Sequence, residues 1–186
     1  VLVVSRQDAR SRAVRNHDQL LETVSGSLGR ALPACAVRLR VFVGRDHNLA
    51  SAAAIWHRAH VVVAPHGAAL ANIIFVQLGT LVVELGYYSA ATPTRPYAST
   101  VEGLGMPWPA PYYWAAAASA EATLFASMAI GSYSGPMTAN LEDVAALMAN
   151  QIAPRLRRRP DLTGRHLRPP WMTAVCPPAR DGIVPA

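Results

Sequence analysis

The stretch Val61–Leu85, VVVAPHGAALANIIFVQLGTLVVEL, decides the fold. It opens with an apolar β-branched run that is too short for a helix, turns at Pro65-His66-Gly67, and ends in a second β-branched run. Because small and apolar residues recur at helical spacing between the two runs, the predicted order is strand, turn, short helix, strand. Both runs are apolar at consecutive positions, which is typical of strands in the middle of a parallel sheet covered on both faces.

The Pro-His-Gly corner therefore follows the carboxyl end of a buried strand. Ligands of open α/β sheets bind outside such strand ends, and the first turn of the next helix offers unpaired N–H groups to an anion. Gly67, Ala68 and Ala69 are small enough to let a phosphate approach, and His66 supplies a further donor. The corner alone is equally compatible with a plain turn carrying a surface histidine.

Length and composition set the broad class. A chain of 186 residues can form one α/β domain followed by a tail. No run approaches the roughly 18 consecutive apolar residues of a membrane span. Since Val1 lies within an expected strand and is not a Met, we expect the chain to be a piece of a longer protein. Cys35 and Cys176 have no metal-site spacing, so they are either free thiols or one disulfide.

The net charge of +6 comes entirely from arginine, because the chain contains no lysine. Guanidinium groups match the geometry of phosphate oxygens, so the charge fits a nucleotide diphosphate as well as a polynucleotide. Basic residues are not interleaved with aromatic ones, and we therefore expect no nucleic acid as a partner. A nucleic-acid-associated protein that uses its arginine-rich tail remains the weakest alternative.

The pattern before Val61 predicts two further strands and two helices. The predicted strands are Val1–Val4 and the edge-like Val37–Val43, and the predicted helices begin at Asn16 and Leu49. Gly, Ser and Pro predict a loop from Ser25 to Cys35, and the helix Leu49–Ala59 can be capped by Asn48 or Asp46.

The pattern after Leu85 is less regular. A short helix is predicted for Tyr97–Gly105, and an ordered loop or base-stacking surface for Met106–Tyr113. Helices are predicted for Ala115–Ala129 and for Asn140–Ile152, the latter ended by Pro154. We place one domain at residues 1–153 and a disordered Arg/Pro-rich tail at 154–186.

Four arginines crowd the loop after the first strand, at positions 6, 10, 12 and 15. If the sheet is parallel, this loop and the His66-Gly67 corner face the same crevice. A metal site is not expected, because only His57 and His60 share a helix face and no carboxylate or cysteine lies at ligand spacing.

Taken in order, these motifs resemble glycosyltransferase family 61. The resemblance covers about residues 1–113 and rests on Ser5-Arg6, Arg12-Ala-Val-Arg-Asn16, Pro65-His66-Gly67-Ala68-Ala69-Leu70 and Val82-Val83-Glu84-Leu85. The second glycine of the family's H-G-A-G-L motif is Ala69 here, and the acidic residue that often follows its asparagine is displaced to Asp18.

The resemblance implies a Rossmann-like, mostly parallel α/β sheet with helices on both faces, forming the donor-binding half of a GT-B type glycosyltransferase. It implies an inverting, metal-independent transfer from a UDP-sugar such as UDP-xylose, UDP-arabinose or UDP-N-acetylglucosamine to a glycan or protein acceptor, with no other cofactor. It also implies a Golgi or endoplasmic reticulum location, with an N-terminal half and a membrane anchor upstream. A non-catalytic nucleotide-binding or anion-binding module derived from such an enzyme is the main alternative.

The expected roles follow from charge. Arg6 and Arg12 are the predicted catalytic residues, because they can stabilise the leaving diphosphate. The predicted donor-binding residues are Ser5, Asn16, His66, Gly67, Ala68, Ala69 and Glu84. Glu84 is expected to accept sugar or ribose hydroxyls, with pairing to an arginine as the alternative. Asn16 is expected to orient the arginine loop or to cap its helix. No carboxylate is an evident general base, so we expect the base in the N-terminal half and the fragment alone to be inactive.

Overall fold

The computed structural model describes residues 1–7, 9–88, 111–131 and 135–159. Its centre is a six-stranded sheet with the order β2-β1-β3-β4-β5-β6. The strands are β1 (Leu2–Ser5), β2 (Arg40–Val43), β3 (Val61–Pro65), β4 (Leu81–Tyr88), β5 (Thr123–Gly131) and β6 (Met137–Thr138). All neighbours pair in parallel except β5 and β6, and the predicted mostly parallel α/β sheet is confirmed.

The stretch that decides the fold forms the middle of this sheet. β3 and β4 pair in register from Val61 with Leu81 to Pro65 with Leu85, and every residue of β3 is buried. β2 lies at the edge of the sheet, as predicted. The apolar runs are buried because helices cover both faces.

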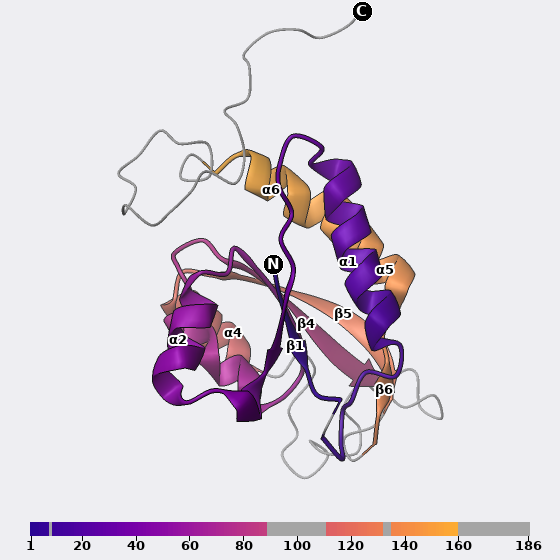
Figure 1. Cartoon of the computed structure of the whole chain (residues 1–186), viewed down its shortest axis with the longest axis vertical. Coiled ribbons are helices and arrows are strands. Elements are labelled where there is room, and N and C mark those ends of the chain that lie inside the picture. Colours follow the sequence, from indigo (N-terminus) through magenta and orange to yellow (C-terminus); the bar gives the residue numbers. More distant parts are fainter. Residues whose placement is uncertain (8, 89–110, 132–134, 160–186) are drawn as a thin grey trace, which may run out of the picture.

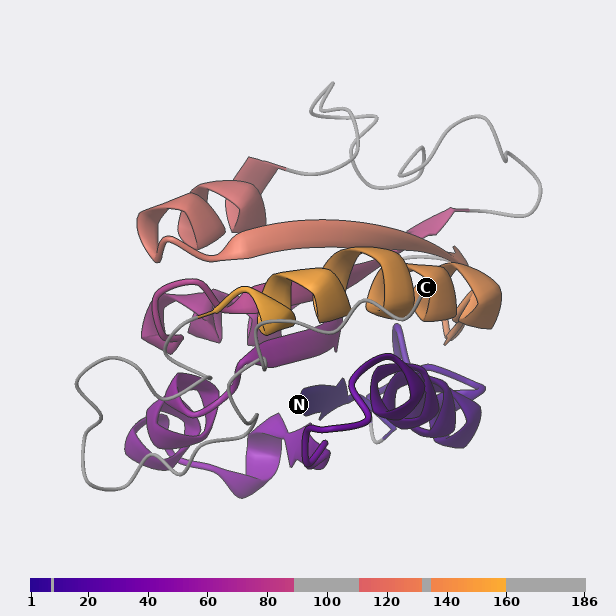
Figure 2. The same cartoon turned by 90° about the horizontal axis from the view of Figure 1, so that it is seen from above.

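Two groups of helices cover the sheet, as Figures 1 and 2 show. On one face, α1 (His17–Ala31) packs with α5 (Leu141–Leu147) and α6 (Ala153–Arg157) on Val3, Val63 and Val83. On the other, α2 (Leu49–His57), the 3₁₀ helix η2 (Ala68–Phe75) and α4 (Pro111–Ser119) pack on Val4, Val62 and Val82. Consecutive strand residues thus enter opposite cores.

The predicted loop at Ser25–Cys35 is wrong for residues 25–31, because α1 continues to Ala31, and is confirmed for residues 32–35. Gly26 and Gly29 weaken a helix, but Val24 and Leu28 are almost completely buried against the sheet. Burial of this face outweighs the low helix propensity. The shorter helix α2 begins as predicted, since the Asn48 side chain accepts a hydrogen bond from the Ser51 N–H.

The predicted helix Ala115–Ala129 is also wrong in its second half. α4 ends at Ser119, and β5 then pairs with β4 along eight consecutive residues, from Thr123 to Ile130. Ser127 and Ala129 are buried on one side of β5, so a period of two is present. The period is hard to recognise in the sequence because alanine is common in helices. The segment forms a strand because it pairs with β4.

Pro154 does not end the C-terminal helix. A five-residue π-helical turn, η3 (Met148–Ile152), follows α5, and α6 continues to Arg157. The Ala153 N–H donates to the Met148 carbonyl. This longer spacing lets Pro154 occupy one of the first two positions of α6, where a missing N–H is tolerated.

Several predictions lie outside the described residues: the helix Tyr97–Gly105, most of the segment Met106–Tyr113, and the tail from residue 160. Tyr113 itself belongs to α4. Among the helices that the structure describes, none is long and apolar enough to cross a membrane.

Candidate functional site

The sheet order creates a switch point between β1 and β3. From β1 the chain crosses to β2 on one side and then returns to β3 on the other side of β1. Ligands of open parallel sheets bind beyond the carboxyl ends of the strands at such a point. The arginine loop follows β1 here, and the His66-Gly67 corner follows β3.

The structure brings Arg6, Arg12 and Gly67 together. A Cβ atom built on Gly67 would lie 2.9 Å from Nη1 of Arg6 and 3.4 Å from Nη1 of Arg12. The backbone of Gly67 has φ 151° and ψ −179°, a conformation essentially confined to glycine. Gly67 is therefore required both by its own backbone and by the two guanidinium groups that approach it.

Arg12 is held in an uncommon backbone conformation. Its φ of 59° lies in the left-handed region, which costs a residue other than glycine about 1–2 kcal/mol. The Arg12 N–H donates to the Gly135 carbonyl, and the Met137 N–H donates to the Ala13 carbonyl. These contacts with the chain before and at β6 hold the loop in place.

Asn16 strengthens the same attachment. Its side chain donates to the Ala139 carbonyl and accepts from the Ala139 N–H, each at 2.9 Å. It makes no side-chain hydrogen bond to the N-terminus of α1, so the predicted side-chain cap is wrong. Asn16 instead anchors the end of the arginine loop, which agrees with the predicted orienting role, whereas direct contact with the donor stays a prediction.

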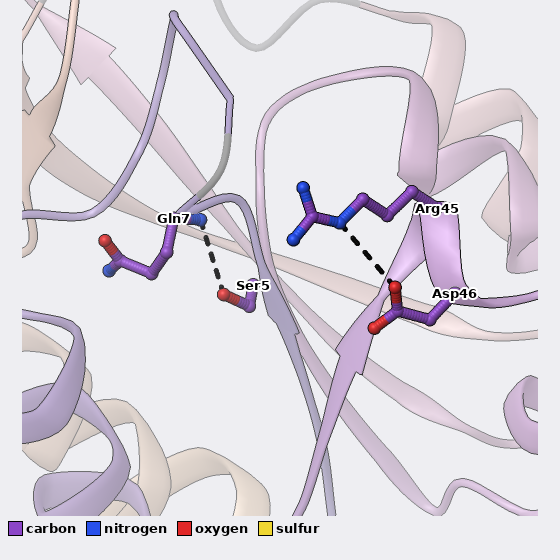
Figure 3. Close-up of polar contacts among 4 residues, drawn as sticks. All are labelled: Ser5, Gln7, Arg45 and Asp46. Atoms are coloured by element: carbon purple, nitrogen blue, oxygen red, sulfur yellow. Dashed lines mark hydrogen bonds and ion pairs between the residues drawn. The ribbon is translucent and has the colours of Figure 1, made fainter.

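Ser5 is the last residue of β1, and Arg45 follows the neighbouring strand β2 (Figure 3). The Ser5 hydroxyl accepts a hydrogen bond from the Gln7 N–H at 3.4 Å and shapes the turn after β1. Arg45 follows β2 and forms an ion pair of 3.6 Å with Asp46. Both of these side chains are more than half exposed, so the pair adds little stability.

His66 and Glu84 form the buried polar centre of the site. His66 Nδ1 and Glu84 Oε1 are 2.5 Å apart, and the Glu84 side chain is completely buried. The His66 N–H of the backbone donates to the Leu85 carbonyl, which fixes the corner on β4. Burying a carboxylate costs free energy unless it is paired, and His66 is the partner of Glu84. The alternative predicted from the sequence was pairing of Glu84 with an arginine. Glu84 Oε2 makes no hydrogen bond to any described residue.

Two tyrosines, neither of which was predicted as a site residue, have rings close to the His66 ring. The ring of Tyr113 lies 5.3 Å from the His66 ring, and that of Tyr87 lies 6.1 Å away, each in an edge-on arrangement. Tyr87 lies near the end of β4 and is buried in the core, while Tyr113 comes from α4. The apolar pattern around Tyr87 predicts that it is buried but not that it lies beside His66. The proximity of Tyr113 to His66 depends on the tertiary packing of α4, which the sequence pattern does not indicate.

Burial raises the pKa of the Tyr113 hydroxyl, and the Glu84 carboxylate raises it further, while Arg12 and Arg6 oppose this shift. These influences place the Tyr113 side chain within electrostatic range of three site residues. At neutral pH the hydroxyl is therefore protonated and is a hydrogen-bond donor.

The backbone beyond Gly67 adds further donors. The first hydrogen bond of η2 runs from the Leu70 N–H to the Gly67 carbonyl, so the amides of residues 67–69 precede it. Ala68 is exposed and Ala69 is half-buried. Their short side chains suit the predicted contact of this backbone with a phosphate, which stays a prediction.

The described residues contain no group of three or more His, Cys, Asp or Glu side chains that suits a metal ion. Cys35 is disulfide-bonded, and the other cysteine, Cys176, lies outside the described residues.

Comparison with known proteins supports the resemblance seen in the motifs. The family model described as Glycosyltransferase 61 matches residues 1–83, a span that ends one residue before Glu84 and includes the arginine loop and the His66-Gly67 corner. No curated protein matches the chain. Because the family consists of glycosyltransferases, this match supports the glycosyltransferase class for the chain. The match over residues 1–83 supports an assignment of the chain to glycosyltransferase family 61.

Proposed function

We propose that the chain binds the diphosphate of a UDP-sugar at the β1/β3 switch point and belongs to the donor-binding half of a GT-B type enzyme. The convergence of Arg6 and Arg12 on Gly67 carries this proposal. Two guanidinium groups beside an unobstructed backbone offer charge and several N–H donors, the chemistry that a diphosphate requires.

The same groups suit the transition state of sugar transfer. As the bond between the sugar C1 and the phosphate oxygen breaks, its electron pair moves to the UDP oxygen, where negative charge increases. Fixed donors aimed at that oxygen stabilise the transition state more than the ground state. Arg12 is suited to this task because contacts with Gly135 and Met137 hold its loop. The guanidinium charges make the proposed transfer independent of a metal ion.

In this proposal His66 contacts a phosphate or sugar oxygen, and Glu84 acts through His66. Glu84 is fully buried and its Oε1 is engaged by His66 Nδ1. A carboxylate in this position orients the imidazole ring. This role replaces the predicted contact between Glu84 and the hydroxyls of the donor.

The proposed reaction is inverting, with UDP-xylose, UDP-arabinose or UDP-N-acetylglucosamine as donor. The hydroxyl oxygen of a glycan or protein acceptor attacks C1 opposite the departing UDP, and its proton passes to a general base. We place this base in the N-terminal half of the enzyme. Family members are typically enzymes of the secretory pathway, and we propose a Golgi or endoplasmic reticulum location for this one, with an upstream anchor.

Titration calorimetry with UDP tests the diphosphate site. We expect wild-type chain to bind UDP, and Arg6→Ala or Arg12→Ala to weaken binding at least tenfold, because each removes a charged hydrogen-bond donor. Arg10→Ala is the matched control, since Arg10 lies exposed in the same loop. Equal weakening by all three substitutions would indicate general charge attraction and would contradict the assigned site.

A transfer assay separates an enzyme from a non-catalytic module. The longer protein that contains this chain should release UDP from its donor and lose this activity in the Arg6→Ala variant. UDP binding without release or transfer, tested across the three proposed donors, would favour the non-catalytic module.

A further inference from the structure

We propose that Tyr113 is a further donor-binding residue, whose hydroxyl donates a hydrogen bond to the UDP diphosphate. The inference rests on the proposed function and extends its site to α4, beyond residues 1–83 that the family model matches.

The geometry places Tyr113 beside the His66-Glu84 pair. Its ring lies edge-on to the His66 ring, with centroids 5.3 Å apart and planes inclined by 69°. Tyr113 also packs against the core that lies between the sheet and the helices α2, η2 and α4. α4 contacts η2, the helix that begins immediately after Gly67. Tyr113 therefore belongs to a helix that lies next to the proposed phosphate contact.

The charged groups around Tyr113 favour a role as hydrogen-bond donor over a role as general base. Burial and the Glu84 carboxylate raise the pKa of its hydroxyl, and the guanidinium groups of Arg12 and Arg6 oppose this shift. The hydroxyl is therefore protonated. A protonated phenol near two cations can donate to an anion that binds between them. A diphosphate would satisfy all three donors together, whereas a neutral uridine would not.

A purely structural role for the hydroxyl has weaker support. Glu84 Oε2 is buried and makes no hydrogen bond to any described residue, so the Tyr113 hydroxyl does not satisfy that oxygen. The ring contact with His66 requires only the aromatic ring. Replacing tyrosine by phenylalanine therefore removes the proposed donor and retains the packing.

The experiment compares Tyr113→Phe with Trp114→Phe by titration calorimetry, using UDP and uridine. Trp114 is the matched control because it follows Tyr113 in α4 and is 48% exposed. We expect Tyr113→Phe to weaken UDP binding about tenfold, the usual effect of losing one hydrogen bond to a charged group. Uridine binding and the midpoint of urea unfolding should stay unchanged.

The outcomes separate this inference from the proposed function. If Arg6→Ala weakens UDP binding but Tyr113→Phe does not, the role of Tyr113 is overturned and the diphosphate site stands. If Tyr113→Phe lowers the unfolding midpoint and leaves the UDP affinity of the folded protein unchanged, the hydroxyl is structural. If the wild-type chain binds no UDP, both proposals are overturned.

Discussion

Replacing Gly67 by alanine tests the local structure and the site at once. Gly67 has φ 151° and ψ −179°, a region that residues with a Cβ avoid. Forcing alanine into it should lower the free energy of unfolding by about 1–3 kcal/mol. The added Cβ would also lie 2.9 Å from Arg6 Nη1, closer than such contacts allow.

These two effects have separate readouts. The steric contact involves the end of a flexible side chain, so Arg6 can shift at little cost to stability. That shift moves its guanidinium away from the proposed diphosphate. We therefore expect Gly67→Ala to weaken UDP binding at least tenfold in calorimetry, in addition to the stability loss measured by urea unfolding.

Gly79→Ala is the matched control. Gly79 also has positive φ, at 74°, but its added Cβ would approach Arg159 Cζ only to 3.6 Å, an ordinary contact. We expect this variant to lose about 1–2 kcal/mol of stability and to bind UDP normally. If Gly67→Ala loses stability but binds UDP as tightly as Gly79→Ala does, the close approach of Arg6 does not matter for binding and the reasoning fails.

Two further predictions concern buried titratable groups. Glu84→Gln should lower the free energy of unfolding by about 1–3 kcal/mol and weaken UDP binding, because the charged partner of His66 is lost. If Glu84 acts through His66, the double variant Glu84→Gln/His66→Gln should bind UDP only slightly more weakly than His66→Gln alone. Binding losses in calorimetry that add fully would contradict this role. Burial lowers the pKa of His17, with Asp18 opposing, and its buried Nδ1 has no hydrogen bond to any described residue. The unfolded chain therefore binds a proton more readily, and stability should fall as pH drops below about 6.5. His17→Leu should flatten this dependence in urea titrations from pH 7 to 5, whereas His57→Leu, at an exposed position, should not. An unchanged slope in His17→Leu would refute the assignment.

The centre of the sheet and the meeting of two anion-binding elements could be predicted from sequence. Consecutive apolar residues at Val61–Ala64 and Leu81–Val83 leave no solvent-facing side, so both runs must lie in an inner sheet. Parallel pairing then brings the loop after β1 and the corner after β3 to one edge. This topology rule makes the proximity of Arg6, Arg12 and Gly67 predictable without any side-chain detail.

The errors arose where tertiary contacts outweigh local preference. Gly26 and Gly29 suggested a loop, but the buried face of α1 sustains the helix. The alanine residues of β5 suggested a helix, but this segment pairs with β4 as a strand. Pro154 suggested a helix end, but the π-helical turn η3 before it allows the helix to continue as α6. Tyr113 belongs to the same class, because its approach to His66 depends on how α4 packs against η2.

The most direct test of the central claim is a crystal structure of the chain with UDP. The account predicts a diphosphate beyond the carboxyl ends of β1 and β3, with phosphate oxygens about 3 Å from guanidinium nitrogens of both Arg6 and Arg12. A diphosphate held elsewhere on the molecule, with neither guanidinium group in contact, would contradict it.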